Sequence, residues 1–194
     1  MIIGCDLDGV AARYVQGLRA EVGSAFGLTP EQILAELPDP LDYGFTNWKI
    51  IGDKFKEYHT NAVDAGLYAK LEAFEGASKV LWQLSDEGYY IRIITSRFVK
   101  HGQNAKVVAD TAIWLDKNDI PYRGLDFEKN KTEVFADIYI DDAPMNIDAF
   151  HAKGKKVIVF DAPYNQDTED FGLRAYNWDD VLRLIHENAP LVAA

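Results

Sequence analysis

The chain has 194 residues, of which 48% are hydrophobic and 26% are charged, and its formal net charge is −11. This length fits one domain with room for an insertion, and the apolar content is sufficient for a core. So acidic a chain is not expected to bind duplex nucleic acid or a membrane surface, because both attract cationic patches. It has no apolar stretch near the roughly 18 residues of a membrane span, no leader-like N-terminus and a single cysteine. We therefore expect a cytoplasmic protein without an intrachain disulfide.

Four short apolar runs are typical of buried strands in a parallel sheet. They cover Ile2–Cys5 and residues 89–95, 136–140 and 156–160. Apolar residues at helical spacing predict helices over residues 76–87, 103–118 and 177–188. Strand–helix alternation of this kind predicts an α/β fold, a three-layer Rossmann-like sandwich with a parallel sheet at its centre.

Residues 14–75 interrupt this alternation, because they contain no convincing strand. Helices are expected over residues 12–26, from a capping Thr29 to just before Pro38, and over residues 48–62. The pattern predicts a small all-helical subdomain, residues 14–75, inserted between the first and second strands of a core made of residues 1–13 and 76–194.

Polar side chains follow the predicted strands at the points where the strands end. They are Asp6 and Asp8 after the first strand, Thr95, Ser96 and Arg97 after the second, and Asp141 and Asp142 after the third. Lys131 lies ten residues before Asp141, on a predicted helix that leads into the third strand. Because parallel strands end at one edge of a sheet, where ligands bind in open α/β folds, we expect these side chains to meet.

The residue types in this set suit phosphoryl transfer. Buried carboxylates cost desolvation energy unless a cation offsets it, and a hard cation such as Mg²⁺ prefers oxygen ligands. One aspartate can attack phosphorus and form an aspartyl-phosphate, while a second one moves protons. A hydroxyl and a lysine can hold the charged phosphoryl oxygens.

Four sequence segments stand out in chain order: Asp6-Leu7-Asp8-Gly9-Val10, Thr95, Lys131 and Asp141-Asp142. They match the four motifs of the haloacid dehalogenase (HAD) superfamily, which the chain therefore resembles. Within that superfamily it is similar to the 5′(3′)-deoxyribonucleotidases of the 5′-nucleotidase C type. The residues that carry this similarity are 6–10, 76–77, 88–89, 94–97, 139–144 and 161–165. The resemblance implies a HAD-like catalytic core, with residues 14–75 as a helical cap of the C1 type.

The resemblance also implies roles for the aspartates. Asp6 would be the nucleophile and a Mg²⁺ ligand. Asp8 would be the general acid/base and would bind the metal through its backbone carbonyl. Asp141 would complete the metal site, and Asp142 would support it without touching the ion.

The remaining candidates would bind the substrate. Thr95 and Lys131 would hold the phosphate, with Ser96 nearby. Tyr14 and Trp48 would be the cap aromatics that hold the base of a nucleotide.

Several of these residues also have a purely structural interpretation. Arg97 stands where the family often has proline, which leaves open a contact with the sugar or leaving group, or a surface ion pair. Lys131 could be a solvated helix lysine, with Lys129 as its substitute, and Tyr14 and Trp48 could be packing residues. An Asp-x-Asp-Gly sequence alone also occurs in calcium loops, but residues 10–12 are Val-Ala-Ala, which excludes an EF-hand.

The sequence thus predicts a Mg²⁺-dependent phosphomonoesterase that acts on (deoxy)nucleoside monophosphates through an aspartyl-phosphate. Its alternatives are a HAD phosphatase for another small phosphomonoester, such as a sugar phosphate, and a catalytically silent HAD-like binding protein. The expected partner is a small phosphorylated substrate. The sequence is silent on the oligomeric state, although a homodimer is common among the enzymes it resembles.

Overall fold

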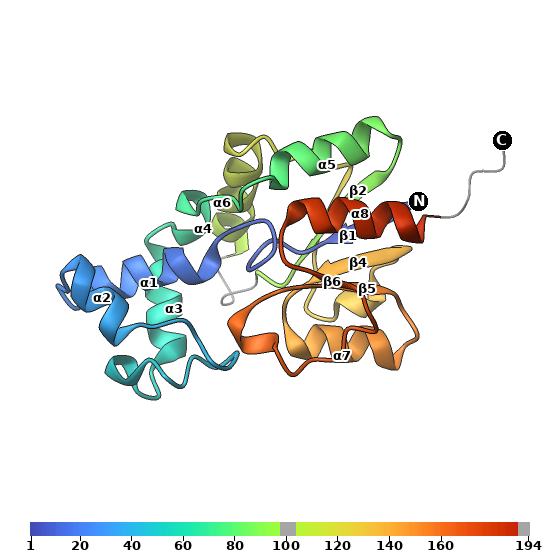
Figure 1. The fold of residues 1–194 in the computed structure, drawn as a ribbon. Helices are drawn as coiled ribbons and strands as arrows, with labels where there is room; N and C mark the ends of the chain where they lie inside the picture. The colour runs from blue at the N-terminus through green and yellow to red at the C-terminus, as the bar shows by residue number, and fades with distance from the viewer. Residues whose placement is uncertain (98–103, 190–194) are drawn as a thin grey trace, which may run out of the picture.

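A six-stranded, all-parallel sheet forms the centre of the protein, in the computed structural model that describes residues 1–97 and 104–189 (Figure 1). The strands are β1 (Ile2–Cys5), β2 (Tyr90–Thr95), β3 (Gly124–Phe127), β4 (Ile138–Asp141), β5 (Val157–Phe160) and β6 (Arg174–Ala175). Their order across the sheet is β3-β2-β1-β4-β5-β6. The four predicted strands are therefore confirmed, and they lie side by side as β2-β1-β4-β5. The two edge strands, β3 and β6, were not predicted.

Helices cover both faces of the sheet and complete three layers. One face carries α5 (Ala77–Asp86), α6 (Asn104–Lys117) and α8 (Trp178–Asn188), and the other carries α7 (Pro144–Ala152) and the short 3₁₀ helix η2 (Lys131–Glu133). Alternate strand residues point to opposite layers: Ile93 packs into the cluster with α5, and Ile94 into the cluster with α7. The predicted α/β sandwich is confirmed, although Gln103, the expected start of α6, lies outside the described residues.

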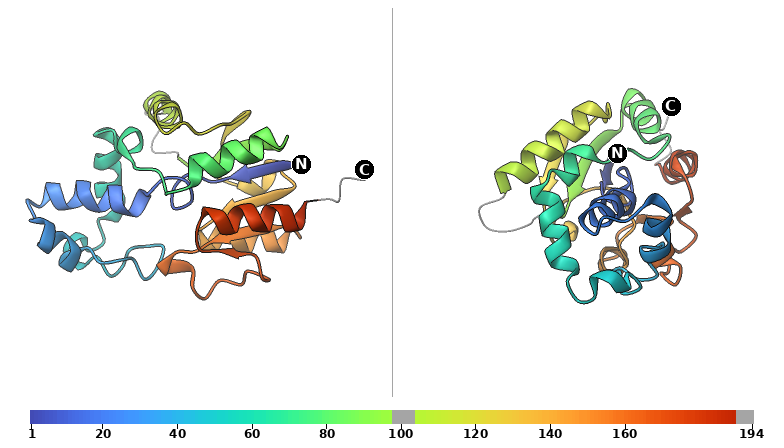
Figure 2. Two further views of the ribbon diagram at one scale, coloured as in Figure 1. Left: turned by 45° about the horizontal axis from the view of Figure 1, so that its top comes forward. Right: turned by 90° about the vertical axis from the view of Figure 1, so that its left-hand side faces the viewer.

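The segment between β1 and α5 forms a helical insertion beyond the carboxyl ends of the strands (Figures 1 and 2). It contains α1 (Tyr14–Ala25), α2 (Pro30–Glu36), η1 (Lys49–Ile51), α3 (Phe55–Asp64) and α4 (Leu67–Lys70). Helix α2 begins as its sequence predicts, since the Thr29 hydroxyl accepts from the Gln32 N–H and the Gln32 side chain accepts from the Thr29 N–H.

Two helix predictions need correction. The single helix expected over residues 48–62 is broken, because Gly52 ends η1 with a φ of 54° and α3 begins only at Phe55. The helix expected around Lys131 is only the three-residue η2. The helical spacing of apolar residues continues across Gly52, so the sequence pattern does not reveal the break at that residue.

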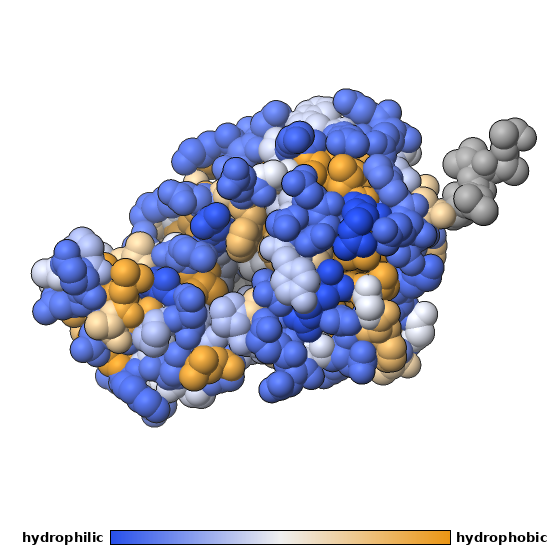
Figure 3. All heavy atoms as spheres, viewed as in Figure 1, coloured by the Kyte–Doolittle hydropathy of each residue, from blue (hydrophilic) through white to orange (hydrophobic). Residues whose placement is uncertain are grey.

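The surface shows no extended apolar face in the view of Figure 3, where hydrophilic residues predominate and hydrophobic ones gather in small groups. Within the described ranges, the structure contains no helix with the length and apolar character needed to cross a membrane.

Candidate active site

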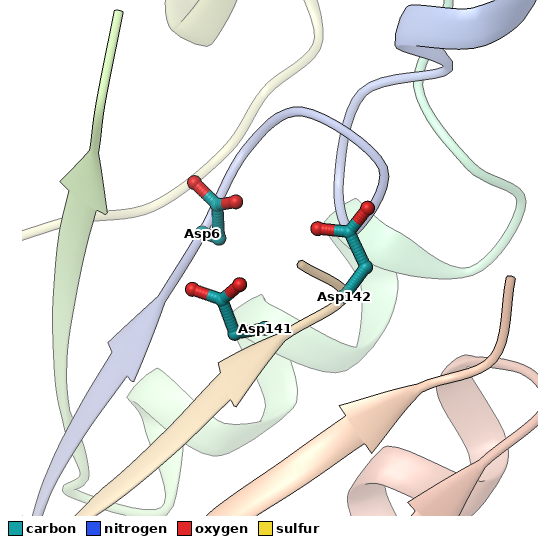
Figure 4. A group of neighbouring side chains, drawn as sticks. All are labelled: Asp6, Asp141 and Asp142. Atoms are coloured by element: carbon teal, nitrogen blue, oxygen red, sulfur yellow. The ribbon is translucent and has the colours of Figure 1, made fainter. Parts of the chain in front are cut away.

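Three carboxylates converge at the carboxyl edge of the sheet (Figure 4). Asp6 directly follows β1, Asp141 is the last residue of the neighbouring β4, and Asp142 comes next. One oxygen from each lies within 4.8 Å of the others, and all three residues are buried. The Asp6 N–H donates to the Ile140 carbonyl at 3.0 Å, so the sheet pairing itself sets the position of Asp6.

The Lys131 ammonium is the cation built into this cluster. Its Nζ lies 2.8 Å from Asp6 Oδ2 and 2.7 Å from Asp141 Oδ2, and its side chain is only 3% exposed. Burial raises the pKa of Asp6 to about 7, although Lys131 opposes the shift. Burial, together with the charges of Asp6 and Asp141, also raises the pKa of Asp142. Lysine therefore compensates only part of the negative charge gathered here.

A divalent cation fits this arrangement. Three carboxylates and one ammonium leave a formal charge of −2 in the buried cluster, and every candidate ligand atom is an oxygen. Asp141 already accepts hydrogen bonds from the Ala143 N–H and the Asn146 amide, both at 3.0 Å. Asp142 Oδ1 is buried and has no hydrogen-bond partner among the described residues, so it has a lone pair to offer.

The loop after Asp6 is tightly folded against the same cluster. Gly9 has a φ of 86°, and a Cβ at this position would run into the Asp142 carboxylate, so both conformation and space require glycine. The Leu7 carbonyl accepts three successive N–H groups, those of residues 10–12. Trp178 of α8 donates from Nε1 to the Val10 carbonyl at 3.2 Å. The loop that carries Asp8 is thus fixed from both sides.

Hydroxyl and ammonium groups border the carboxylates at the end of β2. Thr95 and Ser96 both line the cavity above the cluster, as do Lys129 and Lys131. The buried Thr95 Oγ1 has no hydrogen-bond partner within the part of the chain that the structure describes, whereas Ser96 donates to the Glu128 carbonyl at 3.0 Å. This group of donors matches what an anionic phosphate needs.

Arg97 is buried away from the cavity, so a direct contact with the substrate does not fit its position. Its side chain is fully enclosed, and it donates from Nε to Asp8 Oδ2 at 2.9 Å and from Nη2 to Asp8 Oδ1 at 2.7 Å. It is therefore neither a surface ion pair nor a residue that lines the cavity. Its partner Asp8, at 22% side-chain exposure, does line the cavity.

Aromatic side chains from the insertion form the opposite wall of this cavity of about 330 Å³. The wall consists of Tyr14, Tyr43, Phe45, Phe55, His59 and Tyr68. The Tyr14 hydroxyl and His59 Nδ1 share a hydrogen bond of 2.7 Å, and the Phe55 ring stacks on the His59 ring. Tyr14 thus lies where a substrate contact was predicted, although the contact itself stays a prediction.

Trp48 does not lie at the cavity, so the stacking role considered for it does not fit its position. It is 1% exposed, and its Nε1 donates to the Pro38 carbonyl at 2.7 Å. Its ring meets the Phe45 ring edge-on, with centroids 4.8 Å apart. Trp48 packs behind the wall and supports Phe45, which is the alternative interpretation of this residue.

Sequence reasoning missed residues that hold the carboxylates in place. Tyr164 donates from its hydroxyl to Asp142, and Asn165 donates from Nδ2 to the Asp142 backbone carbonyl at 2.8 Å. Asn146 binds Asp141. The segment 161–165 carries part of the family resemblance, and polar residues just beyond a predicted strand are a signal that could have found Tyr164 and Asn165.

Solved structures with a similar overall fold include a predicted phosphatase and a haloacid dehalogenase-like hydrolase. A predicted phosphatase from Clostridium acetobutylicum superposes with a TM-score of 0.61 and 14% identity, over 96% of this chain and 98% of that one. A haloacid dehalogenase-like family hydrolase from Streptococcus pneumoniae superposes with a TM-score of 0.58 and 16% identity, over 94% of this chain and 96% of that one. At these identities the likeness establishes the fold alone.

Sequence comparison is more specific. The family described as "5' nucleotidase, deoxy (Pyrimidine), cytosolic type C protein" matches residues 1–192. A protein from Chlorobaculum tepidum with the provisional name 5'(3')-deoxyribonucleotidase is 40% identical, over 95% of this chain and 90% of its own length. The 5'(3')-deoxyribonucleotidase of Bacillus subtilis is 30% identical, over 62% of this chain and 66% of its own length. The chain belongs to this nucleotidase family, and it is a hydrolase of phosphomonoesters with a small phosphorylated substrate.

Proposed function

We propose that this protein is a Mg²⁺-dependent nucleotidase that removes phosphate from deoxyribonucleoside monophosphates through an aspartyl-phosphate on Asp6. The observation that carries the proposal is the buried cluster of Asp6, Asp141, Asp142 and Lys131 below a cavity with an aromatic wall. The description of the family and the names of the relatives support the same substrate class.

Asp6 is the proposed nucleophile. One of its carboxylate oxygens attacks phosphorus, the bond between phosphorus and the ester oxygen breaks, and the leaving oxygen takes a proton from Asp8. The products of this step are the nucleoside, which leaves as an alcohol, and a phosphoryl group bound covalently to Asp6. Both carboxylates reach the same cavity, as this proton transfer requires.

Water completes the reaction. Asp8, now an anion, accepts a proton from a water molecule as the water oxygen attacks phosphorus. The bond between phosphorus and Asp6 breaks, inorganic phosphate leaves, and Asp8 is again protonated for the next turnover. The net reaction converts a phosphomonoester and water into an alcohol and phosphate.

The other polar groups bind and orient the phosphate. We assign the phosphoryl oxygens to Thr95, Ser96 and Lys131, because the Thr95 hydroxyl is unpartnered among the described residues and Lys131 already touches Asp6. Asp6, Asp141 and the Asp8 backbone carbonyl would hold the Mg²⁺, with the free Asp142 oxygen within reach. When bound, the ion supplies positive charge that offsets the carboxylates and the developing charge on phosphate.

The insertion selects the substrate in this proposal. Residues 14–75 act as a cap over a core made of residues 1–13 and 76–194, and Tyr14, Phe55 and Tyr68 present flat rings to the bound molecule. A nucleobase offers two faces for stacking, whereas a sugar phosphate offers none. The cytoplasmic location and the homodimer stay predictions.

A substrate panel with one active-site variant tests this function. Deoxyribonucleoside 5′- and 3′-monophosphates, ribonucleotides and sugar phosphates are compared, with and without Mg²⁺, for release of inorganic phosphate. We expect the deoxyribonucleotides to give the highest kcat/KM and Asp6→Asn to abolish turnover while the circular dichroism spectrum is unchanged. A preference for sugar phosphates would favour the alternative phosphatase, and normal activity of Asp6→Asn would overturn the mechanism.

A further inference from the structure

Arg97 is the one fully enclosed arginine among the described residues, and its partner belongs to the catalytic machinery. It lies two residues beyond the end of β2, and both of its contacts with Asp8 come from one edge of the guanidinium. Each Asp8 oxygen accepts one N–H, so each oxygen keeps a further lone pair. Since Asp8 lines the cavity, those lone pairs are available to a proton that moves between Asp8 and the substrate or water.

The guanidinium is held by groups other than Asp8. Its Cζ lies 4.4 Å from the centre of the Tyr68 ring and 5.7 Å from that of Trp114. Its third donor, Nη1, binds Thr111 Oγ1 at 3.2 Å, and that hydroxyl in turn donates to the Val107 carbonyl. Arg97 is therefore a rigid reference point to which the Asp8 carboxylate is attached.

The contribution of this ion pair to the stability of the fold does not explain its presence. A buried arginine loses its hydration, and an apolar side chain of the same size serves a core at least as well. A planar two-point contact, in contrast, fixes the orientation of a carboxylate in a way that a single contact does not. The geometry thus favours a role in aiming Asp8.

We propose that Arg97 is a positioning residue that holds the Asp8 carboxylate in the orientation needed for both proton transfers. Arg97 does not touch the substrate, since its side chain is enclosed on all sides. It acts through Asp8, with Tyr68 of the insertion and Thr111 of α6 keeping the guanidinium in place. This inference rests on the function proposed above.

The test compares Arg97→Met, Arg97→Lys, Asp8→Asn and the double variant Arg97→Met/Asp8→Asn. Arg92→Met is the control, because Arg92 lies on β2, the strand that leads to Arg97, and makes the same two-point contact with Asp126 at 2.7 and 2.9 Å, away from the cavity. Each protein is assayed with Mg²⁺ on a deoxyribonucleoside 5′-monophosphate and on p-nitrophenyl phosphate, whose leaving group needs no proton. Urea unfolding checks that each variant is folded.

We expect Arg97→Met to lower kcat on the nucleotide by about 100-fold, within the range of acid–base catalysis, with little change in KM. On p-nitrophenyl phosphate its first turnover stays fast and the later ones become slow, which gives a burst of one nitrophenolate per site. Arg97→Lys recovers part of the loss, and Arg92→Met behaves as the unaltered protein. In the Asp8→Asn background, Arg97→Met lowers the rate by less than about 3-fold, because a group that acts only through Asp8 has nothing left to position.

Other outcomes overturn the positioning role. A higher KM at constant kcat would mean that Arg97 binds substrate, and losses that multiply in the double variant would mean that it acts independently of Asp8. Equal losses on both substrates without a burst would mean a structural role only. If Arg97→Met does not fold, Arg97→Lys and the burst assay decide. If the unaltered protein hydrolyses neither substrate, the proposed function fails; if it is active and the Arg97 variants match it, only the positioning role fails.

Discussion

The two walls of the active-site cavity are built on different principles. The core wall consists of charged and polar side chains at strand ends, and its atoms are set by sheet hydrogen bonds such as that from the Asp6 N–H to the Ile140 carbonyl. The insertion wall consists of rings that hold one another, as Phe45 does with Trp48 and Phe55 at centroid distances of 4.8 and 4.9 Å. The first arrangement suits chemistry that needs fixed atoms, and the second suits recognition of a flat ligand.

Backbone strain marks the insertion wall and is absent from the three carboxylates of the core wall. Phe45 has a φ of 57°, which a bulky side chain adopts only at a cost, whereas Asp6, Asp141 and Asp142 all avoid positive φ. Backbone hydrogen bonds from the Phe45 N–H to the Asp42 carbonyl and from the Trp48 N–H to the Phe45 carbonyl accompany this conformation, and the Phe45 ring packs against Trp48 and Phe55. The two walls should therefore respond differently to substitution, and the following predictions use that difference, from the largest expected effect to the smallest.

Lys131→Met should damage the core wall most. It leaves Asp6 and Asp141 buried without their shared cation, so we expect the free energy of unfolding to fall by about 3 kcal/mol. Turnover should fall by about 10²- to 10³-fold as a phosphate-binding charge is lost. Urea unfolding and phosphate release measure the two effects. Lys153→Met, which breaks a surface pair with Glu133, is the control and should change neither. A comparable loss of turnover in Lys129→Met alone would instead assign the phosphate-binding ammonium to Lys129.

Metal addition probes the same wall through its carboxylates. If the folded protein binds Mg²⁺ as proposed, the ion should raise the melting temperature, and EDTA should reverse the rise and abolish activity. Asp142→Asn should weaken Mg²⁺ binding by about 10- to 100-fold. It should also raise the melting temperature of the metal-free protein, because it removes one of three crowded negative charges. Scanning calorimetry over a Mg²⁺ titration measures both. An unchanged Mg²⁺ dependence would exclude Asp142 from the metal site.

Substitution in the insertion wall should change selectivity and leave the chemistry intact. Phe55→Leu keeps an apolar side chain but loses the flat ring beside His59. We expect KM for a deoxyribonucleoside monophosphate to rise by about 10-fold, since stacking on a base is lost, with KM for 2-deoxyribose 5-phosphate unchanged. The control is Phe171→Leu, because Phe171 is 70% exposed and lies outside the insertion, away from the cavity. A parallel rise in KM for both substrates would show that the ring does not read the base.

The smallest effect concerns the pH dependence of stability. Burial lowers the pKa of His59 below its ordinary 6.5, although the charge of Asp8 opposes the shift, so folding favours the neutral imidazole. The unfolded chain therefore binds more protons at this residue than the folded one as the pH falls through about 6.5, and stability decreases in that region. His59→Gln should flatten this part of the profile between pH 8 and 5.5, as measured by urea unfolding. An unchanged slope would contradict the neutral state of His59.

The central strands could be predicted from sequence because they are continuous apolar runs buried on both faces. The edge strands β3 and β6 could not. Each residue of Gly124–Phe127 is only half-buried, and β6 has two residues, so neither leaves a clear apolar pattern. Both exist because a neighbouring strand offers unpaired backbone groups, which is a tertiary circumstance.

The candidate catalytic residues could be predicted from the sequence for a local reason. A polar residue that ends a buried run or directly follows it must lie at the edge of the sheet, and this holds for Asp6, Thr95 and Asp141. Arg97 and Trp48 show where that reasoning ends. Arg97 follows a predicted strand and Trp48 begins a predicted helix, but neither pattern indicates the partner of the side chain. Those partners, Asp8 and Pro38, are set by packing between distant segments.

The sequence by itself determined the α/β class, the helical insertion and the set of residues at the strand ends, since all of these depend on short-range periodicity and on the geometry of parallel strands. Only the tertiary structure decided that Arg97 turns inward to Asp8, that Trp48 lies behind the cavity, and that Tyr43, Phe55 and Tyr164 complete the site. Those placements join residues that are far apart in the chain through ring packing and buried hydrogen bonds. The energy of such contacts depends on how the whole molecule closes around them, and no local pattern records it.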